Sequence, residues 1–244
     1  MSQKDWFASW FNTSFYHDLY AKRNDEEAQA FIDALSAFFK WDSNVKILDA
    51  CCGSGRHALY MESKGLQVFG LDLSENNILQ AQSFSLHPER WSIADVRDFD
   101  LPNAVQYALN LFTSFGYFET DEDHIAMLQN INRNLMDDGF LVLDFLNVNQ
   151  VMTSLKEEEV VKGALAEYHL SRRIQLNRII KQIKFAADDV EHIYEERVMA
   201  YSSDDIMKLL SLSGFQVMAT WGDYHGSAMH ANSPRCIFIA QKIQ

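Results

Sequence analysis

The sequence predicts an α/β fold: a doubly wound, mostly parallel sheet of seven strands, with an antiparallel β insertion and an N-terminal helical lid. Three observations support this prediction. Five short apolar runs alternate with helix-like segments between residues 45 and 146. The run 140–146 is almost continuously apolar, as expected for a strand buried on both faces. One more helix and two adjacent strands close the chain, which predicts an antiparallel pair at one edge of the sheet.

Local signals mark the individual elements. Asn24 or Asp25, Ser74 and Ser203 are suitable helix caps, and Leu79 is expected on the buried face of the helix that follows Ser74. The predicted strands cover residues 45–50, 67–71, 91–94, 105–112, 140–146, 215–221 and 236–242. The predicted helices cover residues 25–40, 56–64, 75 onward, 121–136 and 204–213.

The first two predicted strands and the turn after the first carry the strongest functional signal. Asp49 ends the first strand, a turn with Cys51, Gly53 and Gly55 follows, and Asp72 ends the second strand. Backbone N–H groups of such a turn face a ligand at the strand ends. Asp72 lies 19 residues after Gly53, close to the spacing at which a carboxylate meets a ribose diol.

Two nucleoside ligands compete for a unit of this kind. A nicotinamide dinucleotide needs the frame G-x-G-x-x-G, and here His57 and Ala58 follow Gly55 without a third glycine. Asp49 lies immediately before the turn, where a carboxylate would repel a pyrophosphate but suits a cationic ligand. These two features favour a cationic nucleoside.

The turn resembles motif I of the class I S-adenosylmethionine-dependent methyltransferases, E/D-x-G-x-G-x-G, with Cys51 in place of the first glycine. The element order of this Rossmann-like family matches as well, and the extra strands resemble those of its small-molecule members. The resemblance implies S-adenosylmethionine (SAM) as the cofactor and S-adenosylhomocysteine (SAH) as its product. It also implies that Asp72 binds the ribose, that Asp49 lies near the methionine ammonium, and that Asp95 and the Val96 amide bind adenine.

The resemblance implies further contacts at the end of the fourth strand. Asn110 and Leu111 would offer backbone groups to the methionine end, and aromatic faces would suit the sulfonium cation. Tyr117 and His225 are the catalytic candidates, with His225 as a general base. The other candidates for cofactor binding are Tyr20, Arg23, Ala50, Cys51, Gly53, Gly55, Leu73, Asn77, Phe112 and Phe115.

Structural roles remain open for several of these residues. Asp95 could cap the local turn, Tyr16 and Tyr20 could form a hydrophobic plug, and His225 could belong to a solvated loop. Phe11, in the same aromatic segment as Tyr16, is expected to pack rather than to contact a ligand.

The predicted function is methyl transfer from SAM to a nitrogen or oxygen atom of a small-molecule acceptor. The alternatives are a nicotinamide-dependent oxidoreductase and a non-catalytic cofactor-binding module. We expect one methyltransferase domain in four parts. They are an N-terminal helical lid (1–43), a cofactor-binding half (44–150), an insertion of two or three antiparallel strands (160–201), and a C-terminal helix with closing strands (202–244).

Composition limits the partners. The chain of 244 residues has a net charge of −13, so we expect no nucleic-acid partner. Its three cysteines lack C-x-x-C spacing, which argues against disulfides and a metal site and is typical of the reducing cytoplasm. Because no apolar run has membrane-spanning length, we expect a soluble, cytoplasmic protein without a membrane partner. A homodimer remains an alternative to a monomer.

Overall fold

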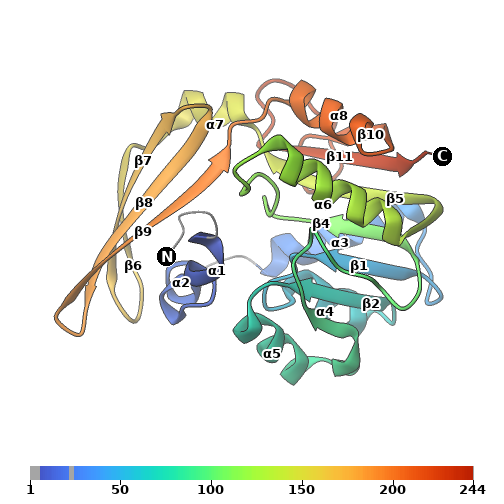
Figure 1. The fold of residues 1–244 in the computed structure, drawn as a ribbon, viewed down its shortest axis with the longest axis horizontal. Helices are drawn as coiled ribbons and strands as arrows, with labels where there is room; N and C mark the ends of the chain where they lie inside the picture. Colours follow the sequence, from blue (N-terminus) through green and yellow to red (C-terminus); the bar gives the residue numbers. More distant parts are fainter. Residues whose placement is uncertain (1–5, 22–24, 244) are drawn as a thin grey trace.

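The computed structural model describes residues 6–21 and 25–243. Its main feature is a seven-stranded sheet in the order β10-β11-β5-β4-β1-β2-β3, in which β11 runs antiparallel to both neighbours and the other pairs are parallel (Figure 1). The predicted doubly wound, mostly parallel sheet is confirmed. Its strands are β1 (Lys46–Ala50), β2 (Gln67–Asp72), β3 (Trp91–Ile93), β4 (Val105–Asn110), β5 (Leu135–Leu146), β10 (Phe215–Trp221) and β11 (Arg235–Lys242).

Helices cover both faces of this sheet and form two hydrophobic cores with it. One face packs against α3 (Asp25–Phe39), α4 (Arg56–Ser63) and α5 (Glu75–Phe84), and the other against α6 (Asp121–Asn134) and α8 (Ser203–Leu212). The chain order reverses between β1 and β4, which are neighbours in the sheet. In a doubly wound fold, a ligand binds at this point, outside the carboxyl ends of the strands.

A second, antiparallel sheet is inserted between β5 and α8, after the short helix α7 (Val148–Ser154). It contains four strands, whereas the sequence predicted two or three. They are β6 (Glu158–Lys162), β7 (Glu167–Gln175), β8 (Arg178–Ala187) and β9 (Val190–Met199). The N-terminal helices α1 (Trp6–Trp10) and α2 (Ser14–Leu19) pack against this sheet, and Figure 1 shows them between the two sheets.

Several predicted boundaries were wrong. β5 begins at Leu135, inside the predicted helix, because Leu135 pairs with Val105 before a register shift interrupts the ladder. The N-cap of α8 is Ser202 rather than Ser203, since Ser202 forms a capping box with Asp205. The predicted cap Ser74 is confirmed, and Asn24 lies outside the described residues.

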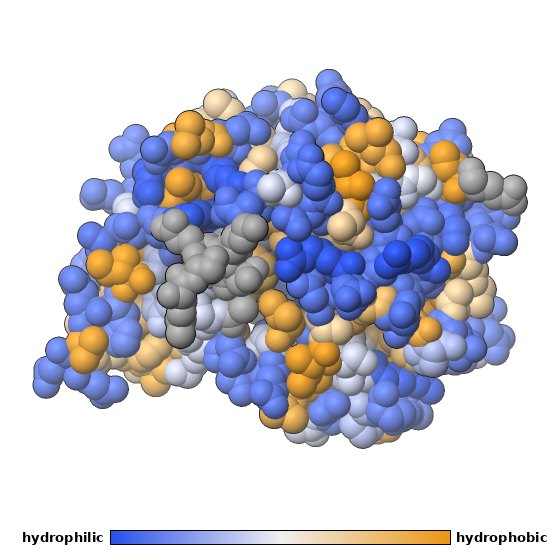
Figure 2. Space-filling model, in the orientation of Figure 1, coloured by the Kyte–Doolittle hydropathy of each residue, from blue (hydrophilic) through white to orange (hydrophobic). Residues whose placement is uncertain are grey.

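The surface in Figure 2 is mostly hydrophilic, with separate apolar patches, one of them over α5. Leu79 belongs to the exposed face of α5 and is 54% exposed, so its predicted burial was wrong; Phe84 and the nearby Leu86 are exposed as well. Among the described helices, none combines the length and the hydrophobicity needed to cross a bilayer.

Candidate active site

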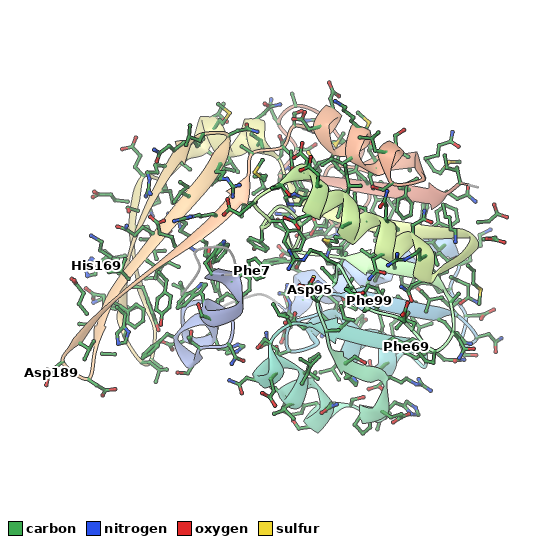
Figure 3. The ribbon with its side chains drawn as sticks, viewed as in Figure 1. Phe7, Phe69, Asp95, Phe99, His169 and Asp189 are labelled. Atoms are coloured by element: carbon green, nitrogen blue, oxygen red, sulfur yellow. The ribbon has the colours of Figure 1, made fainter. Side chains whose placement is uncertain are left out.

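A cavity of about 770 Å³ lies at the carboxyl ends of β1, β2 and β4 and is closed in part by the N-terminal helices. Figure 3 labels Phe7, from α1, and Asp95, which follows β3, and both residues line this cavity. Its volume falls within the roughly 300–1,000 Å³ that is usual for small-molecule sites. The cavity therefore joins the predicted nucleoside-binding edge of the sheet to the predicted lid.

The turn after β1 takes the left-handed conformation three times. Cys51, Gly53 and Gly55 have φ values of 65°, 56° and 85°. Glycine adopts this conformation without steric cost, whereas Cys51 adopts it with strain. A Cβ atom on Gly53 would meet open space, but one on Gly55 would lie 2.6 Å from the ring of Trp91. Gly53 and Cys51 line the cavity, while Gly55 allows close packing of the turn against Trp91 and is not among the lining residues.

Asp72 is held rigidly at the end of β2. Its Oδ2 accepts a hydrogen bond from the Gly53 amide at 2.8 Å, and its Oδ1 accepts one from the Ser74 amide at 2.8 Å. Burial raises the pKa of this carboxyl, against the effect of these backbone donors and of Asn77. Asp72, Leu73 and Asn77 all line the cavity, as the sequence predicted for a cofactor-facing segment.

Asp49 is almost completely buried beneath the same cavity, with an exposed fraction of 2%. Within the described part of the chain, its Oδ2 atom has no hydrogen-bond partner. Burial raises the pKa of Asp49 to about 7; the charge of Asp72 adds to this effect, and Arg56 opposes it. An unsatisfied buried carboxylate oxygen is costly, so this position favours a cationic or hydrogen-bond-donating ligand.

Asp95 lines the cavity, but its carboxylate is engaged by Arg97. Arg97 Nη2 lies 2.6 Å from Oδ2, and both the Nε atom and the backbone amide of Arg97 donate to Oδ1. Asp95 therefore caps the local turn through the Arg97 amide, as the alternative prediction for this residue stated. The neighbouring Val96, whose amide is predicted to bind adenine, also lines the cavity.

The end of β4 contributes Leu111 and Phe112 to the cavity wall, but two other predicted residues lie elsewhere. Asn110 is completely buried, and its Nδ2 atom donates to the backbone carbonyl of Ala50. Asn110 does not line the cavity, and neither does Ala50, which was also predicted to bind the cofactor. Phe115 is completely buried against Phe145, His124 and Tyr201, so it belongs to the hydrophobic core rather than to the site.

Aromatic rings from the N-terminal segment and from the loop after β4 complete the cavity. Tyr117 packs against Phe11 with ring centroids 5.5 Å apart, Phe11 packs against Tyr16 at 4.8 Å, and all three line the cavity. Tyr20 lines it as well, and its hydroxyl donates to Glu196 at 2.7 Å. The expectation that Phe11 has only a packing role was thus incomplete.

The remaining predicted residues fall outside the site or outside the description. His225 is exposed in the loop before β11, donates its amide to Asp223, and does not line the cavity. Arg23 lies outside the described residues. The described residues contain no cluster of metal-ligating side chains, and their three cysteines are free thiols.

Sequence reasoning missed several lining residues that lie in α3, in α4, or in α1 and the turn directly after it. They occur at the (i, i+4) spacing that places side chains on one helix face, a signal that could have identified them. The missed pairs are Phe7 with Phe11, Asp25 with Gln29, and Arg56 with Tyr60.

These residues fit SAM as a ligand. The cavity offers an unsatisfied carboxylate oxygen on Asp49 for a cation and the fixed carboxylate of Asp72 for a diol. The missing Cβ of Gly53 leaves room for a ligand to approach the backbone. The doubly wound sheet and this cavity together define a class I, SAM-dependent methyltransferase.

Comparisons with known proteins agree with this class. Residues 20–220 match the family model described as a methyltransferase domain, and the chain belongs to that family. It is similar to a putative methyltransferase of Bacillus subtilis, with 24% identity over 81% of this chain and 84% of the relative. It is also similar to a glycine/sarcosine N-methyltransferase of Aphanothece halophytica, with 22% identity over 90% of this chain and 83% of the relative.

Solved structures show the same fold. A crystal structure of a SAM-dependent methyltransferase from Clostridium acetobutylicum superposes with a TM-score of 0.80. The identity is 15%, and the superposition covers 94% of this chain and 97% of the other. Family membership does not support the nicotinamide alternative. The family match begins at Tyr20, so α1 and α2 lie before the matched region.

Proposed function

We propose that this enzyme transfers the methyl group of SAM to a nitrogen or oxygen atom of a small molecule that binds beneath the N-terminal helices. The observation that carries the proposal is a single cavity that joins the buried acids of β1 and β2 to the aromatic residues of α1 and α2. A relative named as a glycine/sarcosine N-methyltransferase favours nitrogen as the acceptor atom.

The cofactor end of the cavity has a distinct role for each acid. Asp72 would accept hydrogen bonds from the ribose hydroxyls, because the Gly53 and Ser74 amides fix its two oxygens in place. Asp49 would hold the methionine ammonium, and Val96 and Leu73 would hold the adenine; all three residues line the cavity. Asp95 acts through Arg97, which holds the loop after β3 against α6 by a second ion pair to Asp123 at 3.2 Å.

The transfer end is built from aromatic side chains. Phe112, Tyr117 and Phe11 wall the space where the acceptor would meet the methyl group. When bound, SAM supplies a methyl group that its sulfonium sulfur has already activated, so the protein chiefly provides position. Holding two reactants in line can lower the barrier by about 7–11 kcal/mol. An amine acceptor that binds in its neutral form needs no strong general base, so the exposed position of His225 is compatible with this proposal.

Cofactor binding is the first test. Isothermal titration with SAM and SAH is expected to show binding to the wild-type chain and a loss of about 100-fold or more in Asp72→Ala, because two hydrogen bonds to a charged acceptor disappear. Asp100→Asn, at an exposed acid away from the cavity, is the matched control and should bind normally. Wild-type protein that binds neither compound at millimolar concentration contradicts the proposal. The acceptor is then sought by screening a metabolite panel for SAH formation.

A further inference from the structure

Two consecutive residues at the edge of the cavity have an unusual backbone conformation. Phe112 and Thr113 follow β4 and have φ values of 57° and 61°. Neither is glycine, so each adopts the left-handed region against a steric penalty. Phe112 lines the cavity, and the guanidinium of Arg56, another lining residue, lies 4.7 Å from its ring. Surrounding structure must therefore hold this loop in place.

Asp144 of β5 supplies two of the hydrogen bonds that do so. Its Oδ2 accepts from the Phe112 amide at 2.7 Å, and its backbone carbonyl accepts from the Thr113 amide at 3.1 Å. The Asp144 side chain is completely buried. A buried carboxylate accepts such short bonds strongly, but it also needs a cationic partner.

Arg235, the first residue of β11, is that partner. Its Nε atom donates to Asp144 Oδ1 at 2.8 Å, and its Nη2 atom donates to Thr113 Oγ1 at 2.7 Å. Tyr224 completes the network, since its hydroxyl donates to Asp144 Oδ2 at 3.0 Å and its ring lies 5.6 Å from the guanidinium. The ring of Tyr224 in turn packs on Phe31 of α3, with centroids 4.7 Å apart.

The network thus ties three parts of the fold to one loop, yet its charged members stay behind the cavity wall. Asp144 and Arg235 are not among the lining residues. We propose that the buried Asp144–Arg235 pair is a positioning device, which holds Phe112 and Thr113 in their left-handed conformation and so sets the place of the Phe112 ring at the transfer end. This inference rests on the proposed function of the cavity.

The test combines hydrogen exchange with kinetics. In Asp144→Asn, the neutral amide has one oxygen where the carboxylate has two, so it cannot accept from both Phe112 and Arg235. We expect the exchange rates of the Phe112 and Thr113 amides to rise about tenfold or more, with little change in the strands of the inserted sheet. We expect kcat for methyl transfer to fall by roughly 10- to 100-fold while SAH affinity changes less than threefold.

Two further variants complete the design. Thr113→Val leaves the ion pair and the two bonds from Asp144 to the loop amides intact and removes only the hydrogen bond between Arg235 and the Thr113 hydroxyl. It should therefore fold and show a smaller change in the same direction in exchange and kcat. Arg173→Lys alters an arginine whose ion pair with Glu195 lies on the inserted sheet, and it should leave both readouts unchanged.

The outcomes separate this inference from the proposed function. Wild-type exchange at both amides in folded Asp144→Asn overturns the inference, as does an increase that is uniform over β4, β5 and β11, which would indicate a general structural role. If Asp144→Asn does not fold, unchanged exchange and kcat in Thr113→Val overturn it. Wild-type protein that binds no SAM or SAH contradicts the proposed function instead, and the exchange comparison still decides whether the pair holds the loop.

Discussion

Gly53 and Gly55 share a left-handed backbone but differ in their surroundings, so their alanine variants should fail in different ways. Gly53→Ala adds a methyl group to open space beside the cavity. The left-handed backbone should lower the free energy of unfolding by about 1–2 kcal/mol, and the main effect should be a loss of SAH affinity. Gly55→Ala brings a Cβ atom to within 2.6 Å of Trp91 and should reduce stability by a further 1–3 kcal/mol or so. Urea unfolding and calorimetry separate the two effects. Normal SAH binding by Gly53→Ala would argue against the proposed cofactor position.

Asp49 should make cofactor binding depend on pH. Its pKa of about 7 in the free protein, raised by burial and by Asp72, exceeds its ordinary value near 3.8. Between about pH 3.8 and pH 7, Asp49 is protonated in the native state but ionised in the unfolded state. The free energy of unfolding therefore falls as pH rises through this interval.

A cationic ligand prefers the ionised form of Asp49, so SAH affinity should increase about tenfold between roughly pH 6 and pH 8. Asp49→Asn should bind more weakly and lose most of this dependence. Calorimetry in buffers of different ionisation enthalpy should also detect proton release in the wild type only. An equally steep pH profile in Asp49→Asn would show that another group titrates.

At the scale of secondary-structure elements, α2 is fastened to the inserted sheet through Asp18. Its carboxylate accepts hydrogen bonds from the amides of Ala164 and Leu165 at 2.7 and 2.9 Å, and from the Tyr168 hydroxyl at 2.8 Å. A Cβ atom on Gly163 would lie 2.0 Å from Asp18 Oδ2, so only glycine leaves room for this arrangement. The contact joins α2 to the small sheet.

Asp18→Asn should weaken this attachment, because an amide cannot accept all three bonds. We expect a loss of about 1 kcal/mol and faster exchange of the α2 amides, while the strands of the large sheet keep their protection. Acid should have the same effect in the wild type. Burial opposes ionisation here, but the hydrogen bonds outweigh it and lower the pKa, so the contribution is lost as pH falls below the ordinary value near 3.8. The exposed Asp98→Asn is the control, and unchanged α2 exchange in Asp18→Asn would contradict this role.

Helices and strands with an apolar face toward the core could be predicted from the sequence. Strands that depend on pairing with distant strands could not. β6 was missed because it is an edge strand of charged residues and two valines, Glu158–Lys162, with no continuous apolar run. The start of β5 was assigned to a helix because its extension at Leu135 depends on pairing with Val105, a contact distant in sequence. Local propensity does not contain such information.

The residues of the candidate site also fall into a group that could be predicted from the sequence and a group that could not. Asp49, Gly53 and Asp72 line the cavity, and their place at this edge of the sheet could be predicted because motif spacing fixes where strand ends and turns lie. Phe115 and His225 were misplaced because nothing local distinguishes a ring that packs on His124 and Tyr201, or an exposed loop histidine, from a residue that faces a ligand. Asp144 and Arg235 are 91 positions apart in the sequence, so no local pattern indicates their ion pair.

For the whole molecule, a ligand that binds only the folded state should raise the melting temperature. SAH at 100 times its dissociation constant contributes about 2.7 kcal/mol. For a chain of this size that corresponds to an increase of roughly 5–11 °C. Thermal unfolding with increasing SAH checks this expectation, and Asp72→Ala should show a much smaller shift at the same concentration. A wild-type melting curve that SAH leaves unchanged would conflict with the proposed site.

The cavity draws its two ends from separate stretches of chain, the donor end from the strands and turns of the large sheet and the aromatic end in part from helices anchored on the small one. Substitutions at cavity-lining residues of α1 and α2 should therefore affect the aromatic end more than the donor end. Under the proposed function, chimaeras that exchange only α1 and α2 between related enzymes should change acceptor preference more than SAH affinity.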